Sequence, residues 1–197
     1  MTTVINFIIN RWIESGIIEK SDEDVYLYGL DLLLFSIVNL IAILITATIF
    51  GKIPESLLLM IAIIPLQAYG GGYHAKTHLR CFLIMYVGWW VVIFALAFVT
   101  PIIATVLSIM AVVLTFILAP VSHVNVPMSP GRKSQLRKYV RFIVLVIAAL
   151  SLAFMWIPIL VHVDVGMVLS VGIGIASLSM LLAHINNFVQ TKQSMTD

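Results

Sequence analysis

The sequence predicts an all-α integral membrane protein with six transmembrane helices preceded by an interfacial amphipathic helix. The first observation is composition: of 197 residues, 61% are hydrophobic and only 10% are charged, whereas a soluble domain carries roughly 25% charged residues. The second is length, because a bilayer core about 30 Å thick needs about 20 apolar residues in a helix. Six such stretches follow one another, so we expect a single polytopic membrane domain over 1–197.

The N-terminal segment, 1–20, has a different pattern from the rest of the chain. Its apolar residues recur at helical spacing with polar residues between them, which predicts an amphipathic helix lying in the membrane interface. The apolar set is Val4, Ile5, Ile8, Ile9, Trp12 and Ile13, and the polar set is Asn6, Asn10, Arg11 and Glu14.

The predicted spans have unequal character. The second is the weakest, because Pro54 and Pro65 bracket it, and we expect the chain from Pro65 to Gly72 to be bent or unwound. Only Thr100 and Pro101 separate the third span from the fourth, which predicts a tight antiparallel pair. The six spans are about 31–50, 53–69, 80–100, 102–120, 140–160 and 165–188.

Small residues in the last span predict close helix packing. Gly166, Gly172 and Gly174 allow a neighbouring helix to approach, either within the chain or in a homodimer.

The positive charges predict the orientation. Six spans place both termini and the segments 70–80 and 120–141 on the same side of the membrane. Of the basic residues in the chain, only Lys52 falls on the other side. The side that carries the termini is therefore expected to be cytoplasmic, in a cell membrane. With a net charge of +2 and basic residues dispersed around the spans, nothing indicates a nucleic-acid partner, so membrane lipid is the expected surrounding. The basic residues of the predicted cytoplasmic side are Arg11, Lys20, Lys76, Arg80, Arg132, Lys133, Arg137, Lys138, Arg141 and Lys192.

The chemically reactive residues gather in one stretch, QAYGGGYHAKTHLRCF at 67–82. Cys81 is the only cysteine, so an intramolecular disulfide is excluded. It is predicted at the cytoplasmic start of the third span, near Lys76 and Arg80, where helix N–H groups and cations stabilise a thiolate. A thiolate is the nucleophile of cysteine hydrolases. The alternative is a small apolar residue in a transmembrane helix.

Two histidines could serve as the base for such a thiol. His78 would share a face with Cys81 in a continuous helix, so geometry favours it. His74 would lie about 10.5 Å away along a helix and could reach Cys81 only if the chain folds back, which Gly70–Gly72 allow. A zinc site of these three side chains is another interpretation, but carboxylates to support a metal are missing nearby. We therefore expect no metal and no cofactor.

The pattern GGYHAKTHLRC resembles the accessory gene regulator B (AgrB) family, bacterial membrane cysteine endopeptidases that process quorum-sensing propeptides. The amphipathic N-terminus and the stretches DEDVYLYGLD and APVSHVNVPMS agree with it, so the resemblance covers roughly residues 1–190. It implies that His74 is the base and Cys81 the nucleophile, with His78 as the alternative base. The family often has an arginine where Gln67 stands here.

The resemblance also implies a partner and a reaction. The partner is a precursor signal peptide with an amphipathic leader and an acidic C-terminal tail. Cys81 would cleave off the tail and keep the remainder as a thioester, which an internal Cys or Ser of the peptide would attack to close a thiolactone or lactone ring. We expect the oxyanion or the loop to be supported by Gly71, Gly72 and Tyr73. The acidic tail is expected to dock on basic residues, which are Lys76, Arg80, Lys133, Arg137 and Lys138. A group that orients the histidine could be Asn125, Asp31 or Gln67.

Two other classes of protein compete with this prediction. A small transporter or channel usually keeps ionisable residues within its spans, whereas Asp31 and His184 lie near span ends and Glu55 and Asp164 beside the outer face. A structural scaffold would be indifferent to Cys81→Ser. The clustered cysteine and histidines therefore favour the peptidase.

Overall fold

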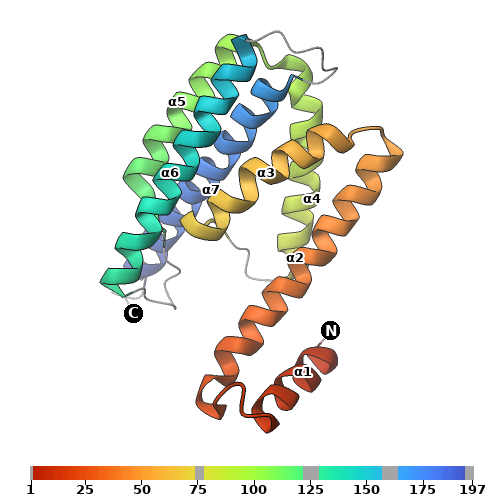
Figure 1. The fold of residues 1–197 in the computed structure, drawn as a ribbon, viewed down its shortest axis with the longest axis vertical. Coiled ribbons are helices and arrows are strands. Elements are labelled where there is room, and N and C mark those ends of the chain that lie inside the picture. The colour runs from red at the N-terminus through yellow and green to blue at the C-terminus, as the bar shows by residue number, and fades with distance from the viewer. Residues whose placement is uncertain (1, 74–77, 122–128, 157–163, 194–197) are drawn as a thin grey trace.

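The computed structural model describes residues 2–73, 78–121, 129–156 and 164–193, and within these ranges the chain is helical and has no strand. Six helices are long and apolar enough to cross a membrane, which confirms the predicted fold class. Figure 1 shows them as a bundle of α5, α6 and α7, crossed by α3 and flanked by α4 and α2. The elements are α1 (Thr2–Glu14), η1 (Lys20–Asp22), α2 (Glu23–Ile49), α3 (Ile53–Gly70), α4 (His78–Ala95), η2 (Leu96–Phe98), α5 (Pro101–Leu118), α6 (Pro130–Trp156) and α7 (Val165–Gln193).

The N-terminal helix α1 lies beside the first turns of α2, away from the bundle (Figure 1). Ile5 and Ile9 of its apolar face are buried, together with Ile18, against α2. Val4 and Phe7 are exposed. The chain thus forms a helix where one was expected, and part of its apolar face packs within the protein. Its position in the membrane interface stays a prediction.

The core of the molecule surrounds α7, which contacts α3, α5 and α6. In its most apolar stretch 61% of the residues are buried, more than in any other of the six long helices. Small side chains of α5 at helical spacing form the buried stripe that faces this core, and small residues let helices approach closely in a membrane. That stripe consists of Ala104, Ser108, Ala111 and Thr115.

Buried hydroxyl groups link the three bundle helices. Ser108 Oγ on α5 donates a hydrogen bond to Ser170 Oγ on α7 (2.9 Å). Ser151 Oγ on α6 donates to Gly166 O on α7 (2.7 Å). Because lipid offers no hydrogen-bond partners, these bonds satisfy polar groups that would otherwise be costly to bury.

The glycines of α7 are packing positions within the chain, as predicted. A Cβ on Gly166 would lie 2.8 Å from Met155 N on α6. A Cβ on Gly172 would collide with the side chain of Ala62 on α3, whereas Gly174 has only an ordinary contact with Leu107. Two of the three glycines are therefore needed for the close approach of α7 to α6 and α3.

Two local predictions differ from the structure. The chain is not unwound directly after Pro65, because α3 runs through this residue and ends only at Gly70, and a membrane favours an unbroken helix. The third and fourth spans do not form a close pair, since α4 packs on α2 and α5 on α6 and α7. Their connection is short, as expected: Thr100 Oγ1 caps α5 by accepting from Ile103 N–H (3.3 Å), and Pro101 follows.

Candidate active site

The glycine run forms a turn that ends α3. Gly71 has φ 77° and ψ 175°, a backbone conformation that is essentially restricted to glycine. Its N–H donates to Gln67 O (3.0 Å) and so closes the helix. A Cβ on Gly71 would also collide with the carbonyl oxygen of Val121. Both the dihedral angles and the close backbone contact therefore require glycine at this position.

Two other parts of the chain hold this turn. Val121, just after α5, donates its N–H to Gly70 O (2.9 Å). Ser179 on α7 accepts a hydrogen bond from Tyr73 N–H at 3.0 Å. Gly70 itself is buried, and a Cβ there would meet the end of the Met180 side chain. The turn is thus fastened on both sides of Gly71, by the segment after α5 and by α7.

Cys81 is the fourth residue of α4, has a free thiol and is partly exposed. The helix turns that carry it are attached to α2: the Phe82 ring meets Phe35 edge to face (centroids 6.4 Å apart) and stacks on Tyr86 (5.6 Å). One turn further, Asn39 Nδ2 of α2 donates to Met85 Sδ (3.2 Å). The thiol is therefore in the first turn of a helix that α2 holds in place.

Several predicted site residues lie outside what the structure describes. They are His74 and Lys76, the side chain of His78, and Asn125. The predicted pairing of a histidine with Cys81 therefore stays a prediction. Asp31 lies on α2, whereas the side chain of Gln67 contacts the turn itself, since a Cβ on Gly72 would be 3.6 Å from it. Gln67 is thus the described candidate that sits at the glycine turn.

The backbone N–H groups of the turn differ in whether they donate a hydrogen bond within the protein. Those of Gly71 and Tyr73 donate within the protein, to Gln67 O and Ser179 Oγ. The N–H of Gly72 has no hydrogen-bond partner in the described ranges. Of the three predicted oxyanion donors, Gly72 is therefore the one whose N–H is not used by any described residue.

Basic residues gather at the end of the molecule that carries Cys81. In Figure 1 the start of α4, the start of α6 and the end of α7 point to this same end. Arg80 and the predicted docking residues Lys133, Arg137 and Lys138 have exposed side chains. The three on α6 fall within two turns of helix and form a concentrated positive surface.

Sequence reasoning missed the residues that hold the turn, Ser179 and Val121, and the role of Arg141. The Arg141 guanidinium donates to Phe116 O (2.8 Å) near the end of α5 and lies 4.8 Å from the Phe116 ring centroid. It thereby satisfies a terminal helix carbonyl just before the segment that holds Gly70. The charge pattern of the sequence predicted only that Arg141 lies on the cytoplasmic side of the membrane. No sequence signal distinguishes Ser179 from other serines.

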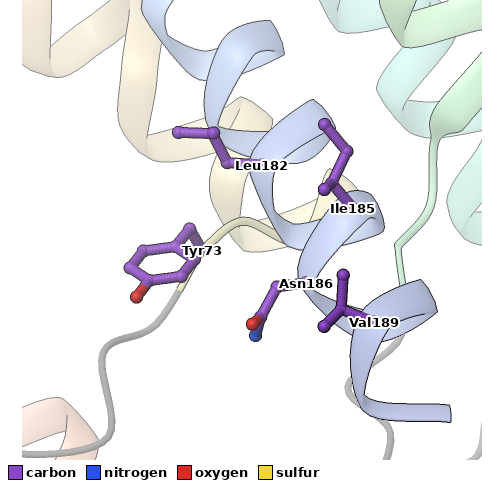
Figure 2. Close-up of a pocket in the computed structure, with 5 residues that line it drawn as sticks. All are labelled: Tyr73, Leu182, Ile185, Asn186 and Val189. Atoms are coloured by element: carbon purple, nitrogen blue, oxygen red, sulfur yellow. The ribbon is translucent and has the colours of Figure 1, made fainter. Parts of the chain in front are cut away.

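A pocket of about 360 Å³ lies beside the turn. Figure 2 shows the Tyr73 ring on one side and α7 side chains on the other, with the amide of Asn186 among aliphatic groups. The α7 residues are Leu182, Ile185, Asn186 and Val189. Among the residues that the structure describes, no group of three or more His, Cys, Asp or Glu could hold a metal ion.

Comparison with known proteins yields a family match. The family model described as accessory gene regulator B matches residues 2–182, most of the chain. Neither the curated proteins nor the solved structures include a match. With its six membrane-crossing helices and this match, the chain belongs to the accessory gene regulator B (AgrB) family of multi-pass membrane proteins, which take part in processing the propeptide of the agr quorum-sensing autoinducer.

Proposed function

We propose that this protein is a membrane cysteine endopeptidase that cleaves a quorum-sensing signal propeptide on its C-terminal side through a thioester at Cys81. The observation that carries the proposal is the place of the only thiol in the chain: the first turn of α4, partly exposed. The first N–H groups of a helix have no partner within it, so they can donate to a substrate that reaches the thiol, and a cysteine sulfur is the nucleophile of cysteine hydrolases.

The reaction proceeds in two transfers. His74, or His78 in the alternative assignment, takes the proton from Cys81 Sγ, and the thiolate attacks the scissile carbonyl carbon. The N–H of Gly72 and those of the first turn of α4 are the candidate donors to the resulting oxyanion. The tetrahedral intermediate collapses, the C–N bond breaks, and the histidine returns the proton to the amine of the departing acidic tail. The N-terminal part of the peptide remains as a thioester.

An internal Cys or Ser of the bound peptide then attacks the thioester carbonyl. Its proton passes through the histidine to Cys81 Sγ, so the free thiol is regenerated and a thiolactone or lactone ring is released. A site at the edge of the bilayer excludes water, which favours this transfer over hydrolysis.

The distribution of charge supports a cytoplasmic site. The termini, the start of α4 and the basic start of α6 belong to one end of the bundle (Figure 1), and Lys52 lies between α2 and α3 at the other. Under the positive-inside rule the basic end faces the cytoplasm, where the propeptide is made. We place both termini and the active site there, and a homodimer stays a prediction.

The alternative, a small transporter or channel, has less support. In the part of the chain that the structure describes, the buried polar side chains are all uncharged. A transporter coupled to ions or protons usually carries ionisable groups within its spans.

A captured intermediate tests the proposal. The purified protein in lipid vesicles is mixed with a synthetic propeptide, quenched in acid and analysed by mass spectrometry. We expect a mass increase equal to the N-terminal peptide fragment, located on the fragment that contains Cys81 and removed by hydroxylamine. Propeptide cleavage that continues unchanged in Cys81→Ala would overturn the proposal, and transport assays in vesicles would then be the next experiment.

Reversing the charges on α6 tests docking of the acidic tail. We expect the triple substitution Lys133→Glu, Arg137→Glu and Lys138→Glu to raise KM about tenfold, because a basic surface concentrates and steers an acidic ligand. The effect should shrink at high salt, which screens exposed charges. Steady-state kinetics at two salt concentrations measure it.

A propeptide with a neutral tail, in which Gln replaces each acidic residue, is the matched control and should not distinguish the triple variant from the wild type. If KM for the acidic-tailed peptide does not change, the basic segment sets topology only.

A further inference from the structure

Ser179 lies 106 residues from Tyr73 in the sequence, yet its Oγ accepts the Tyr73 N–H at 3.0 Å. Tyr73 immediately precedes His74. The approach is close: a Cβ on Gly72 would lie only 3.0 Å from Ser179 Oγ. The hydroxyl group of one α7 residue therefore contacts the backbone where the chain leaves the glycine turn.

The same face of α7 also lines the pocket beside the Tyr73 side chain. Ser179, Leu182, Asn186 and Val189 are spaced by three or four residues, so they share one face of the helix. The Tyr73 ring stands beside this face, across the pocket from Leu182, Asn186 and Val189 (Figure 2). Tyr73 is thus attached to α7 through its backbone hydrogen bond, and its ring lines the pocket that this face of α7 also lines.

The helix that provides this attachment is a rigid support. It is the most buried of the six long helices and contacts α3, α5 and α6. Catalytic groups are held more accurately when regular, well-packed elements support them. The other two bonds of the turn, from Gly71 to Gln67 and from Val121 to Gly70, act before the chain reaches Tyr73. Among the bonds between described residues, the one to Ser179 is the one that holds Tyr73, the residue before His74 in the sequence.

We propose that Ser179 is a positioning residue of the peptidase, which fixes the backbone of Tyr73 and thereby orients the catalytic base His74 that follows it. This inference rests on the proposed function. Consecutive Cα atoms are about 3.8 Å apart, so a hydrogen bond on one residue restricts the placement of the next. In this role Ser179 acts through the peptide chain and not by contact with the substrate or the thiol.

Three variants of α7 test the proposal. Ser179→Ala removes the acceptor, and Ser179→Thr keeps a hydroxyl group at the same position. Ser177→Ala is the matched control: its hydroxyl donates to Gly174 O within α7 (2.8 Å), and it is two residues away. The kinetics of propeptide cleavage and the thermal unfolding of each variant are measured in the same vesicles.

We expect Ser179→Ala to lower kcat about tenfold without raising KM, because small misplacements of a catalytic group have large effects on rate. Ser179→Thr should restore most of kcat, and Ser177→Ala should behave as the wild type. A rise in KM alone would assign Ser179 to substrate binding and overturn the proposal. Equal loss in Ser179→Ala and Ser179→Thr would also overturn it, since the hydroxyl would then be irrelevant.

Alkylation of Cys81 supplies a readout that needs no propeptide. Because the chain has one cysteine, iodoacetamide reports on that thiol alone. We expect the pH dependence of the alkylation rate in Ser179→Ala to change in the same direction as in His74→Ala, while Ser177→Ala follows the wild type. An unchanged profile in Ser179→Ala, alongside a changed one in His74→Ala, would refute positioning. If even His74→Ala and Cys81→Ala leave cleavage unaltered, the proposed function itself has failed.

Discussion

Alanine at Cys81 or at His74 is expected to reduce propeptide cleavage by at least about 10³-fold, the scale at which loss of a nucleophile or its base acts. Cys81→Ala removes the atom that forms the thioester. His74→Ala removes the group that takes and returns the proton. The measurement is the initial rate of tail release, followed by mass spectrometry of the quenched reaction.

The variant His78→Ala separates the two candidate bases. We expect it to keep most of the wild-type rate, since the family resemblance assigns the base to His74. The reverse result, with cleavage lost in His78→Ala and kept in His74→Ala, would retain the cysteine mechanism and move the base to the residue that simple helical geometry favours. Equal cleavage rates in the wild type and in the Cys81, His74 and His78 variants would contradict the cysteine mechanism.

The substitution Gly71→Ala is expected to lower kcat about 10²-fold, the scale of a misplacement of about 1 Å. Alanine at φ 77° and ψ 175° costs about 1–3 kcal/mol in backbone strain. Its Cβ would in addition collide with the carbonyl oxygen of Val121, which is backbone and has little freedom to move. The turn must therefore open, and the segment that carries His74 moves with it. Rates and thermal unfolding of the variant measure both consequences.

A second glycine provides the matched control. Gly51, between α2 and α3, has a similar positive φ of 65° but nothing within 4 Å of a Cβ position. Gly51→Ala should therefore introduce strain without moving the turn, so stability falls and kcat is retained. If Gly71→Ala loses stability but cleaves at the wild-type rate, the turn does not position the base.

The sequence predicted least well where a helix ends and which neighbouring helices it packs against. Pro65 suggested an interruption in the second span, yet the helix continues for five more residues to Gly70, because in lipid the remaining backbone bonds outweigh the one that proline lacks. The short link at Thr100 and Pro101 suggested a close helix pair. Instead, the small-residue stripe of α5 directs it to α6 and α7.

The membrane class, the six spans, the single cysteine and the family motif follow from the sequence alone. Each is a local or compositional property, since a run of about 20 apolar residues has the length that crosses the core of a bilayer. The contacts that support the candidate site could not be predicted in this way. That Ser179 and Val121 hold the glycine turn, and that Gly72 keeps a free N–H among the described residues, required the tertiary structure. These contacts join residues far apart in the chain, and they depend on how α7 packs against its neighbours, which hydrophobic periodicity does not specify.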